Sequence, residues 1–315
     1  MRVAFRSAYL GHRGTEVALH DYATEARKIL GIDPVILLPP RSPGEPAGVR
    51  ARFEESFSCR ECGEPGQLDR ILREENCEAF YCLKNGHWDG WSSARTATWI
   101  HAIFPEVQSH GTVYAFVSRW LSEVWGHGEV PWVPHIIRPW AEEGDLRQEL
   151  GIPQGAKVFG RHGGADSFDL PAAHEAVRTV SLRHPEIHFV FLNTDPFLFP
   201  RPANVHHLPG TADRGRVGRF LRTCDAMVHG RMRGETFGMA IAEAGVCGKP
   251  VFTWRHSPER NHLGWITDEC WRYSDARELH DKLVHFHPGD AMDFSFVAEF
   301  APARVMEKFR EVFLR

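Results

Sequence analysis

Two carboxylates, Glu235 and Glu243, stand at either end of a short apolar segment that contains glycine, GETFGMAIAEAG. A strand pattern precedes the segment, and a helical pattern begins near Phe237 or Gly238. A helix that starts at a strand end offers free backbone N–H groups and the positive end of its dipole to a phosphate. At about 1.5 Å per residue the acids lie roughly 12 Å apart, near the span from a ribose across a diphosphate to a hexose.

The two acids also have a simpler interpretation. Glu235 would be a helix-start acid that complements the dipole, and Glu243 would be a solvent-facing helix residue. For a pair of acids in isolation, this interpretation would be preferred. The neighbouring residues shift the balance, because they match a known signature.

The segment resembles the E-x7-E motif of retaining glycosyltransferases, notably glycosyltransferase family 4 of the GT-B fold. The family pattern is Glu, any residue, Phe-Gly, an apolar helix, Glu-Ala, and then Gly-(Lys/Arg)-Pro-Val. The resemblance covers the second half of the chain well and the first half only in its pattern of elements. The matching positions are Glu235, Phe237, Gly238, Glu243, Ala244, Gly248, Lys249, Pro250 and Val251.

This resemblance implies a role for each matching residue. Glu243 would bind the ribose of a donor nucleotide, and Glu235 would lie beside the donor sugar, with a role in catalysis. The backbone at Phe237, Gly238 and Met239 would face the diphosphate and the sugar. Front-face attack by the acceptor, with retained anomeric configuration, is the mechanism usually proposed for the family.

The resemblance extends to two loops that would supply positive charge. Arg161, in VFGRHGGADSFD, matches an arginine that commonly contacts the diphosphate, and Gly163 and Gly164 would leave room for it. The family usually has a Lys-Gly pair a few residues later, where this chain has SFD and no lysine. Arg231 or Arg233 could supply the missing cation, although either is equally consistent with a solvated surface residue.

The first half contributes two weaker matches. Gly14 and Thr15 correspond to the family's glycine-rich loop, and Arg13 could add a cation there; a helix start capped by Thr15 is the alternative. His101 resembles a histidine that lies close to the donor sugar. The chain has 19 histidines, so a purely structural role for His101 is the competing interpretation.

Alternating strand and helix patterns must position these residues. They run through the first half, stop at the proline-rich stretch GEVPWVPHIIRPW, and then resume. We therefore expect an α/β protein of the GT-B type, in which two Rossmann-like, doubly wound domains face a central cleft. Residues 1–138 would form an acceptor-side domain and 139–290 a donor-binding domain, while the helix in 291–315 would pack back on the first domain.

The resulting functional hypothesis is a retaining, metal-independent transferase without a cofactor. It would move a sugar from a nucleotide-diphosphate sugar to an acceptor hydroxyl on a glycan, a protein, a lipid or a small molecule. The missing Lys-Gly pair leaves open a sugar-nucleotide-binding protein that has lost catalysis. A GT-B epimerase is a further alternative, for which the sequence shows no added catalytic acids.

Composition limits the partners and the location. The net charge of −4 gives no reason to expect nucleic acid as a partner. The start MRVAF lacks a secretory signal pattern, and no apolar run reaches transmembrane length. We expect a cytoplasmic protein, with peripheral membrane contact left open.

Four of the seven cysteines have a loose zinc-ribbon spacing. They are Cys59 and Cys62 in CREC, and Cys77 and Cys82 in CEAFYC. The second pair lies in a pattern typical of a buried strand, where cysteine acts as a small hydrophobe. We therefore predict no metal site, and a zinc-stabilised interaction module is the alternative.

Overall fold

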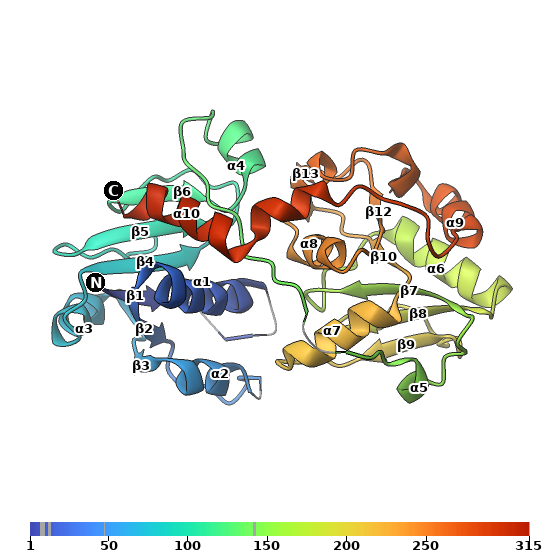
Figure 1. Ribbon diagram of the computed structural model, residues 1–315, viewed down its shortest axis with the longest axis horizontal. Coiled ribbons are helices and arrows are strands. Elements are labelled where there is room, and N and C mark those ends of the chain that lie inside the picture. Colours follow the sequence, from blue (N-terminus) through green and yellow to red (C-terminus); the bar gives the residue numbers. More distant parts are fainter. Residues whose placement is uncertain (7–9, 12–13, 47, 141–142, 315) are drawn as a thin grey trace. The chain divides into compact units, whose positions relative to one another are not determined.

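A computed structural model describes the chain except for residues 7–9, 12–13, 47, 141–142 and 315 (Figure 1). The chain divides into two compact units. Unit 1 comprises Met1–Ile136 and Glu299–Arg315, and unit 2 comprises Ile137–Ala298. The proline-rich stretch thus contains the passage from the first unit to the second.

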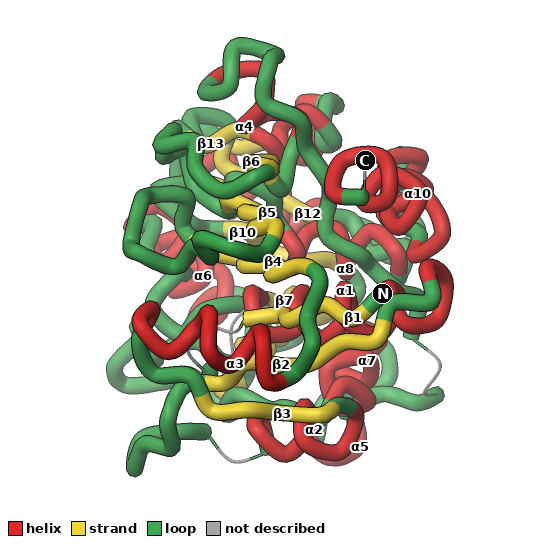
Figure 2. The backbone as a smooth tube through the Cα atoms, turned by 90° about the vertical axis from the view of Figure 1, so that its left-hand side faces the viewer, coloured by secondary structure: helices red, strands yellow, loops and turns green. Residues whose placement is uncertain are grey.

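Unit 1 is built on a parallel sheet of six strands in the order β3-β2-β1-β4-β5-β6, which can be followed strand by strand in Figure 2. Its central strands read as continuous apolar runs because helices cover both faces of such a sheet. The strands are β1 (Arg2–Arg6), β2 (Asp33–Leu38), β3 (Ser58–Glu61), β4 (Ala79–Lys84), β5 (Ala97–Ala102) and β6 (Val113–Phe116).

Five α-helices of unit 1 are described: α1 (Gly14–Leu30), α2 (Val49–Ser56), α3 (Leu68–Glu74), α4 (Arg119–Val124) and α10 (Pro302–Phe313), with the short 3-10 turn η1 (Pro65–Gln67). The C-terminal helix α10 packs beside α1 and β6 (Figure 1). Its buried Phe309 ring lies 5.9 Å from that of Tyr22 and 5.4 Å from that of Tyr81. Burial of this apolar face attaches the end of the chain to unit 1.

Unit 2 holds a second parallel sheet of six strands in the order β14-β12-β10-β7-β8-β9, and a small parallel pair, β11-β13. The strands of the large sheet are β7 (Lys157–His162), β8 (Ile187–Leu192), β9 (Val205–Leu208), β10 (Ala226–His229), β12 (Val251–Trp254) and β14 (Arg272–Tyr273). The pair consists of β11 (Gly234–Glu235) and β13 (Glu259–Arg260).

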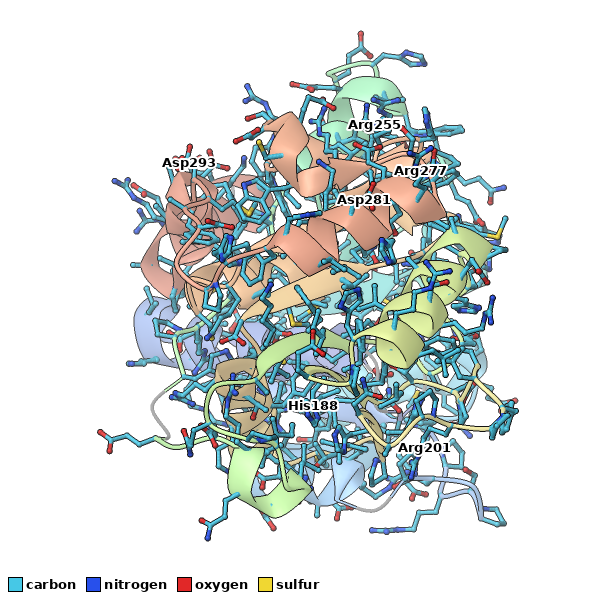
Figure 3. The ribbon with its side chains drawn as sticks, turned by 90° about the vertical axis from the view of Figure 1, so that its right-hand side faces the viewer. His188, Arg201, Arg255, Arg277, Asp281 and Asp293 are labelled. Carbon is cyan, nitrogen blue, oxygen red and sulfur yellow. The ribbon has the colours of Figure 1, made fainter. Side chains whose placement is uncertain are left out.

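The described α-helices of unit 2 are α5 (Arg147–Leu150), α6 (Pro171–Arg183), α7 (Arg214–Thr223), α8 (Met239–Val246) and α9 (Ala276–His285). The 3-10 turns are η2 (Asn261–Gly264), η3 (Glu269–Trp271) and η4 (Ser295–Phe300), the last of which runs into unit 1. Helices α6 and α9 pack together, and α8 packs on β10 and β12. Arg277 and Asp281 lie on the exposed face of α9 (Figure 3).

Both large sheets reverse their strand order at one place. In unit 1 the reversal lies between β1 and β4, and in unit 2 between β7 and β10. Right-handed connections put helices on opposite faces on the two sides of such a reversal, which opens a crevice at the carboxyl ends of the two strands. The predicted α/β architecture of two Rossmann-like domains is confirmed.

Two elements of unit 1 were missed by the sequence patterns. Helix α2 buries only Val49, Arg50 and Phe53, so its apolar spacing is weak. Strand β3 is a polar edge strand of sequence SCRE, without the apolar alternation that identifies a strand.

The four cysteines with zinc-ribbon spacing do not converge. Cys59 lies on β3 and Cys82 on β4, and β2 and β1 separate these strands, which places them about 14 Å apart across the sheet. Burial raises the pKa of the Cys59 and Cys77 thiols to about 11, which opposes the thiolate form that zinc binds. No group of three His, Cys, Asp or Glu side chains suited to a metal ion occurs among the described residues.

None of the helices in the described part of the chain combines the length and the apolar character needed to cross a lipid bilayer.

Candidate functional site

The predicted donor residues gather where the strand order of unit 2 reverses. Arg161 and His162 end β7, and His229 ends the neighbouring strand β10. The loop after His229 leads through the short strand β11 into α8. Parallel strands bring their carboxyl ends to one edge of the sheet, so residues far apart in sequence meet there.

Helix α8 begins at Met239, close to the predicted start. Its N-cap is Gly238, which has a left-handed backbone with φ of 102° and makes no side-chain cap hydrogen bond. The preceding carbonyl, of Phe237, accepts a hydrogen bond of 2.8 Å from Asn261 Nδ2. The Phe237 ring is buried 5.3 Å from the ring of Trp265. The contacts of Phe237 with Asn261 and Trp265 therefore fix the start of the helix, and Gly238 provides no side-chain cap for the N–H groups of its first turn.

Glu235 lies on β11 and is held from two sides. His229 Nε2 is 3.3 Å from its Oε1, and Arg231 Nη1 donates to its Oε2 at 3.0 Å. Burial alone would raise the pKa of Glu235. The His229 hydrogen bond and the charges of Arg231 and Arg161 outweigh it and leave that pKa below its usual value. Glu235 is thus an oriented, ionised carboxylate.

His229 contacts Glu235 and was not singled out by the sequence patterns. Its Nδ1 lies 2.9 Å from the Thr253 hydroxyl, on the neighbouring strand β12. Because an ionised Glu235 can only accept, Nε2 carries the proton, and in the neutral ring Nδ1 accepts from Thr253. The buried ring of His262 lies 4.7 Å away, and burial holds the pKa of His262 far below its usual value. His229 therefore links the sheet to Glu235.

Glu243 is not the solvent-facing residue of the simpler interpretation, since it is only 4% exposed. Arg214 Nη1, at the start of α7, donates to its Oε1 at 3.0 Å. His162 Nε2 lies 3.4 Å from its Oε2, and the Arg214 guanidinium lies 4.2 Å from the ring centre of Trp140. Burial lowers the pKa of His162 in spite of the nearby carboxylate. The sequence patterns pointed to none of these three partners.

Arg161 is hydrogen-bonded to the loops that follow β7 and β8. It donates to the Thr194 hydroxyl at 2.5 Å and to the Gly164 carbonyl at 2.9 Å. Burial lowers its pKa to about 10, so it remains charged at neutral pH. At Gly163, φ is 147° and an added Cβ would lie 3.1 Å from Arg161 Nη2, which shows how closely the glycine turn wraps the guanidinium. A contact of Arg161 with a diphosphate stays a prediction.

The two loop arginines diverge. Arg231 pairs with Glu235, whereas Arg233 Nε donates to Glu259 Oε1 at 2.6 Å. Glu259 is buried on β13, and its burial raises its pKa. Arg231 therefore lies beside Glu235, the carboxylate predicted to contact the donor sugar. Arg233, which precedes β11, forms an ion pair with Glu259 on β13.

A glycine makes this arrangement possible. Gly234 has φ of 80°, and an added Cβ would collide with the Glu259 carbonyl oxygen and lie 2.7 Å from Ser257 Cβ. We expect Gly234→Ala to lower the free energy of unfolding by about 3 kcal/mol, from a left-handed backbone and a backbone clash together. Gly248 also has positive φ, 65°, but open space around it. Gly248→Ala should cost only about 1 kcal/mol, and equal losses in urea denaturation would contradict the clash.

His101 lies in the core of unit 1 and is 0% exposed. Its Nδ1 is 2.7 Å from the Tyr81 hydroxyl, and its Nε2 is 2.9 Å from the Val133 carbonyl oxygen. A contact between this ring and a donor sugar stays a prediction. The observed bonds describe a histidine packed in the core of unit 1.

Burial lowers the pKa of His101 to about 4, which predicts acid sensitivity. Between about pH 6.5 and pH 4 the unfolded chain binds the proton and the folded chain does not. Stability from this group is complete above pH 6.5 and should fall by about 3 kcal/mol as the pH drops to 4. In urea denaturation across this range His101→Gln should show a smaller slope. An unchanged slope in His101→Gln would refute the assignment.

Of the predicted loop in the first half, Arg13 lies outside the described residues. Gly14 and Thr15 are the first residues of α1, where Gly14 is exposed. They lie at the carboxyl edge of the unit 1 sheet, as expected for a loop that follows β1.

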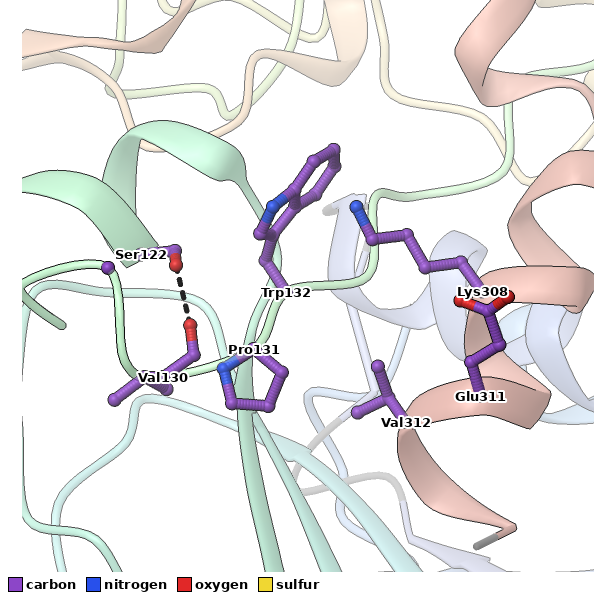
Figure 4. Close-up of a pocket in the computed structure, with 8 residues that line it drawn as sticks. Ser122, Val130, Pro131, Trp132, Lys308, Glu311 and Val312 are labelled. Carbon is purple, nitrogen blue, oxygen red and sulfur yellow. Dashed lines mark hydrogen bonds between the residues drawn. The ribbon is translucent and has the colours of Figure 1, made fainter.

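A pocket of about 360 Å³ lies in unit 1 (Figure 4). Trp132 and Lys308 line it, and the Lys308 Nζ lies 2.6 Å from the centre of the Trp132 ring. Burial lowers the pKa of Lys308 to about 8. The indole face is thus covered by the chain's own amine, and none of the predicted donor residues belongs to this pocket.

Comparison with solved structures finds a similar fold in proteins of remote sequence. HepE from Anabaena, solved with UDP and glucose, has a TM-score of 0.70 at 15% identity, covering 99% of this chain and 98% of that one. Sucrose-phosphate synthase from Thermosynechococcus elongatus has a TM-score of 0.63 at 13% identity, covering 99% and 95%. The chain has the GT-B fold.

The GT-B fold is shared by more than one kind of enzyme. UDP-GlcNAc 2-epimerase from Neisseria meningitidis, solved with UDP-GlcNAc, matches with a TM-score of 0.62 at 11% identity over 100% of both chains. The family model described as "Glycosyl transferases group 1" matches residues 201–263, a segment that contains Glu235 and Glu243. No curated protein sequence matches the chain. The family-model match, on a GT-B fold, supports a glycosyltransferase.

Proposed function

We propose that the chain is a retaining glycosyltransferase, similar to family 4, which transfers a sugar from a nucleotide-diphosphate sugar to an acceptor hydroxyl. The observation that carries this proposal is the start of α8, with no side-chain cap, between two ordered carboxylates, Glu235 and Glu243. Structures of HepE with UDP and with UDP-glucose support a nucleotide sugar as the ligand. A cytoplasmic location and independence of metal ions belong to the same proposal.

In this proposal Glu243 binds the ribose. Its Oε1 already accepts from Arg214, and each carboxylate oxygen has a further lone pair for a ribose hydroxyl. His162 is neutral at physiological pH because burial lowers its pKa, so it adds no second charge beside the carboxylate. Hydrogen bonds from hydroxyl groups to a carboxylate are stronger than those between neutral groups.

Glu235 lies beside the donor sugar in the proposed mechanism. As the glycosidic bond breaks, negative charge grows on the leaving diphosphate and positive charge on the sugar ring. The N–H groups of α8 and the Arg231 guanidinium stabilise the diphosphate, and Glu235 stabilises the sugar. The acceptor attacks from the same face, and a diphosphate oxygen takes the proton of its hydroxyl, which retains the anomeric configuration.

A donor screen tests the proposal. The melting temperature of the full chain is measured with UDP, ADP and GDP and with their glucose conjugates, since a ligand that binds the folded chain raises it. Conjugates that bind are then assayed for slow release of free nucleotide. We expect one base to stabilise the chain and its sugar conjugate to be hydrolysed. The absence of stabilisation by every nucleotide would overturn the proposal.

A second candidate function is sugar-nucleotide binding without catalysis. It is favoured by the loop after β7, which lacks a lysine, and by Arg161 near the end of that strand, which is already bonded to Thr194, Ser167 and Gly164. Fewer cations would then face the leaving diphosphate. Tight nucleotide binding with neither transfer nor hydrolysis of any donor would favour this function over the first.

A further inference from the structure

A second charged cluster lies where the strand order of unit 1 reverses. Arg6 is the last residue of β1, and Lys84 is the last residue of the neighbouring strand β4. Both are buried, at 8% and 4% exposed. They occupy the place at which open parallel sheets of this class bind ligands.

Arg6 is stacked but poorly paired. Its guanidinium lies 3.5 Å from the centre of the buried Trp91 ring. Its Nη1 makes only a weak contact of 3.9 Å to Cys82 Sγ, and its buried Nε has no hydrogen-bond partner. Within the described part of the chain, no carboxylate forms an ion pair with Arg6.

Lys84 forms an ion pair with one carboxylate, that of Asp89. It pairs with Asp89, which also accepts from the Trp91 N–H at 3.1 Å, and its Nζ lies 3.2 Å from His110 Nε2. Burial lowers the pKa of His110, so this ring is neutral at physiological pH. Two cations therefore face one described anion, and the Asp89 side chain, 27% exposed, connects the cluster to solvent.

An excess cation withdrawn from water is unfavourable unless an anion joins it. A guanidinium stacked on an aromatic ring keeps its planar N–H groups free for the oxygens of a phosphate or a carboxylate. We propose that Arg6 and Lys84 bind an anionic group, a phosphate or a carboxylate, carried by the acceptor. The assignment of the anion to the acceptor rests on the proposed glycosyl transfer, whereas the anion site itself does not.

Calorimetry with inorganic phosphate tests this site. Phosphate is titrated into the full chain at constant ionic strength, alone and with saturating UDP, which would occupy the start of α8. In the presence of UDP we expect Arg6→Gln to weaken phosphate binding by about tenfold or more, the loss of a charge-assisted hydrogen bond. Arg6→Lys, which keeps the charge without the planar fork, should retain part of the affinity. Arg119→Gln, at a side chain 71% exposed, should change it less than twofold.

The outcomes separate the site from the proposed function. Equal phosphate affinity in wild type and a folded Arg6→Gln variant would overturn the site. A loss of UDP affinity in Arg6→Gln would assign the anion to the donor and overturn the link to the acceptor. If UDP, ADP, GDP and their glucose conjugates all fail to bind while phosphate binding still depends on Arg6, the donor proposal fails and the anion site stands. With a working donor, glucose 6-phosphate and glucuronate should accelerate UDP release more than glucose does.

Discussion

Replacement of Glu235 by Gln should lower the turnover number by about 10²–10³-fold, the effect of removing one preorganised electrostatic group from a reacting centre. The amide has the size of the carboxylate but lacks the negative charge that would stabilise the positive charge on the sugar ring. Nucleotide affinity should stay within about threefold, because Glu235 is placed at the sugar and not at the ribose. Single-turnover kinetics with the donor found in the screen would measure the chemical step.

The control for this variant is Glu175→Gln on α6, which removes an exposed carboxylate paired with Arg178. It should leave both turnover and affinity unchanged. Unaltered turnover in Glu235→Gln, with the nucleotide still bound, would remove Glu235 from the mechanism. A variant that no longer melts cooperatively would be replaced by Glu235→Asp, which keeps the charge and shortens its reach.

The same carboxylate limits the pH dependence of the rate. Burial would raise the pKa of Glu235, but the hydrogen bond from His229 and the nearby charge of Arg231 hold it below its usual value of 4.5. The group therefore remains ionised above pH 5, and its contribution should be lost only as the pH falls through the lowered pKa. An acid-side decline in rate at a higher pH must come from another group.

Replacement of Glu243 by Ala should weaken binding of the free nucleotide by about 100-fold. Hydrogen bonds to a charged group contribute about 1.5–3 kcal/mol each, so the loss of the ribose contacts corresponds to two orders of magnitude in Kd. Calorimetry with the nucleotide alone measures this loss without any contribution from the sugar. An affinity within threefold of wild type would place the ribose elsewhere.

Removal of Glu243 also releases Arg214, which is bonded to it at 3.0 Å. Arg214→Gln and the double variant therefore complete a mutant cycle. If Glu243 acts directly on the ribose, the double variant should bind as weakly as Glu243→Ala. A double variant restored to wild-type affinity would show that the freed arginine, and not the lost carboxylate, impairs binding.

The sequence by itself predicted most of the architecture and the centre of the candidate site. Strong apolar periodicity identified the buried parallel strands and the start of α8, and the spacing of Glu235 and Glu243 placed both acids around it. These features are local, because a helix start, a buried strand and a glycine turn are set by residues adjacent in the chain. The polar strand β3 was missed for the same reason, since its pairing partner and not its own pattern makes it a strand.

Only the tertiary structure decided which side chains surround the two acids. His229 meets Thr253 across neighbouring strands, and Arg214 reaches Glu243 from another helix. It also placed His101 in a core, where sequence position had suggested a ligand contact. The physical reason is that a parallel sheet joins strand ends separated by tens of residues, so the partners of a buried charge depend on strand order, which no local pattern encodes.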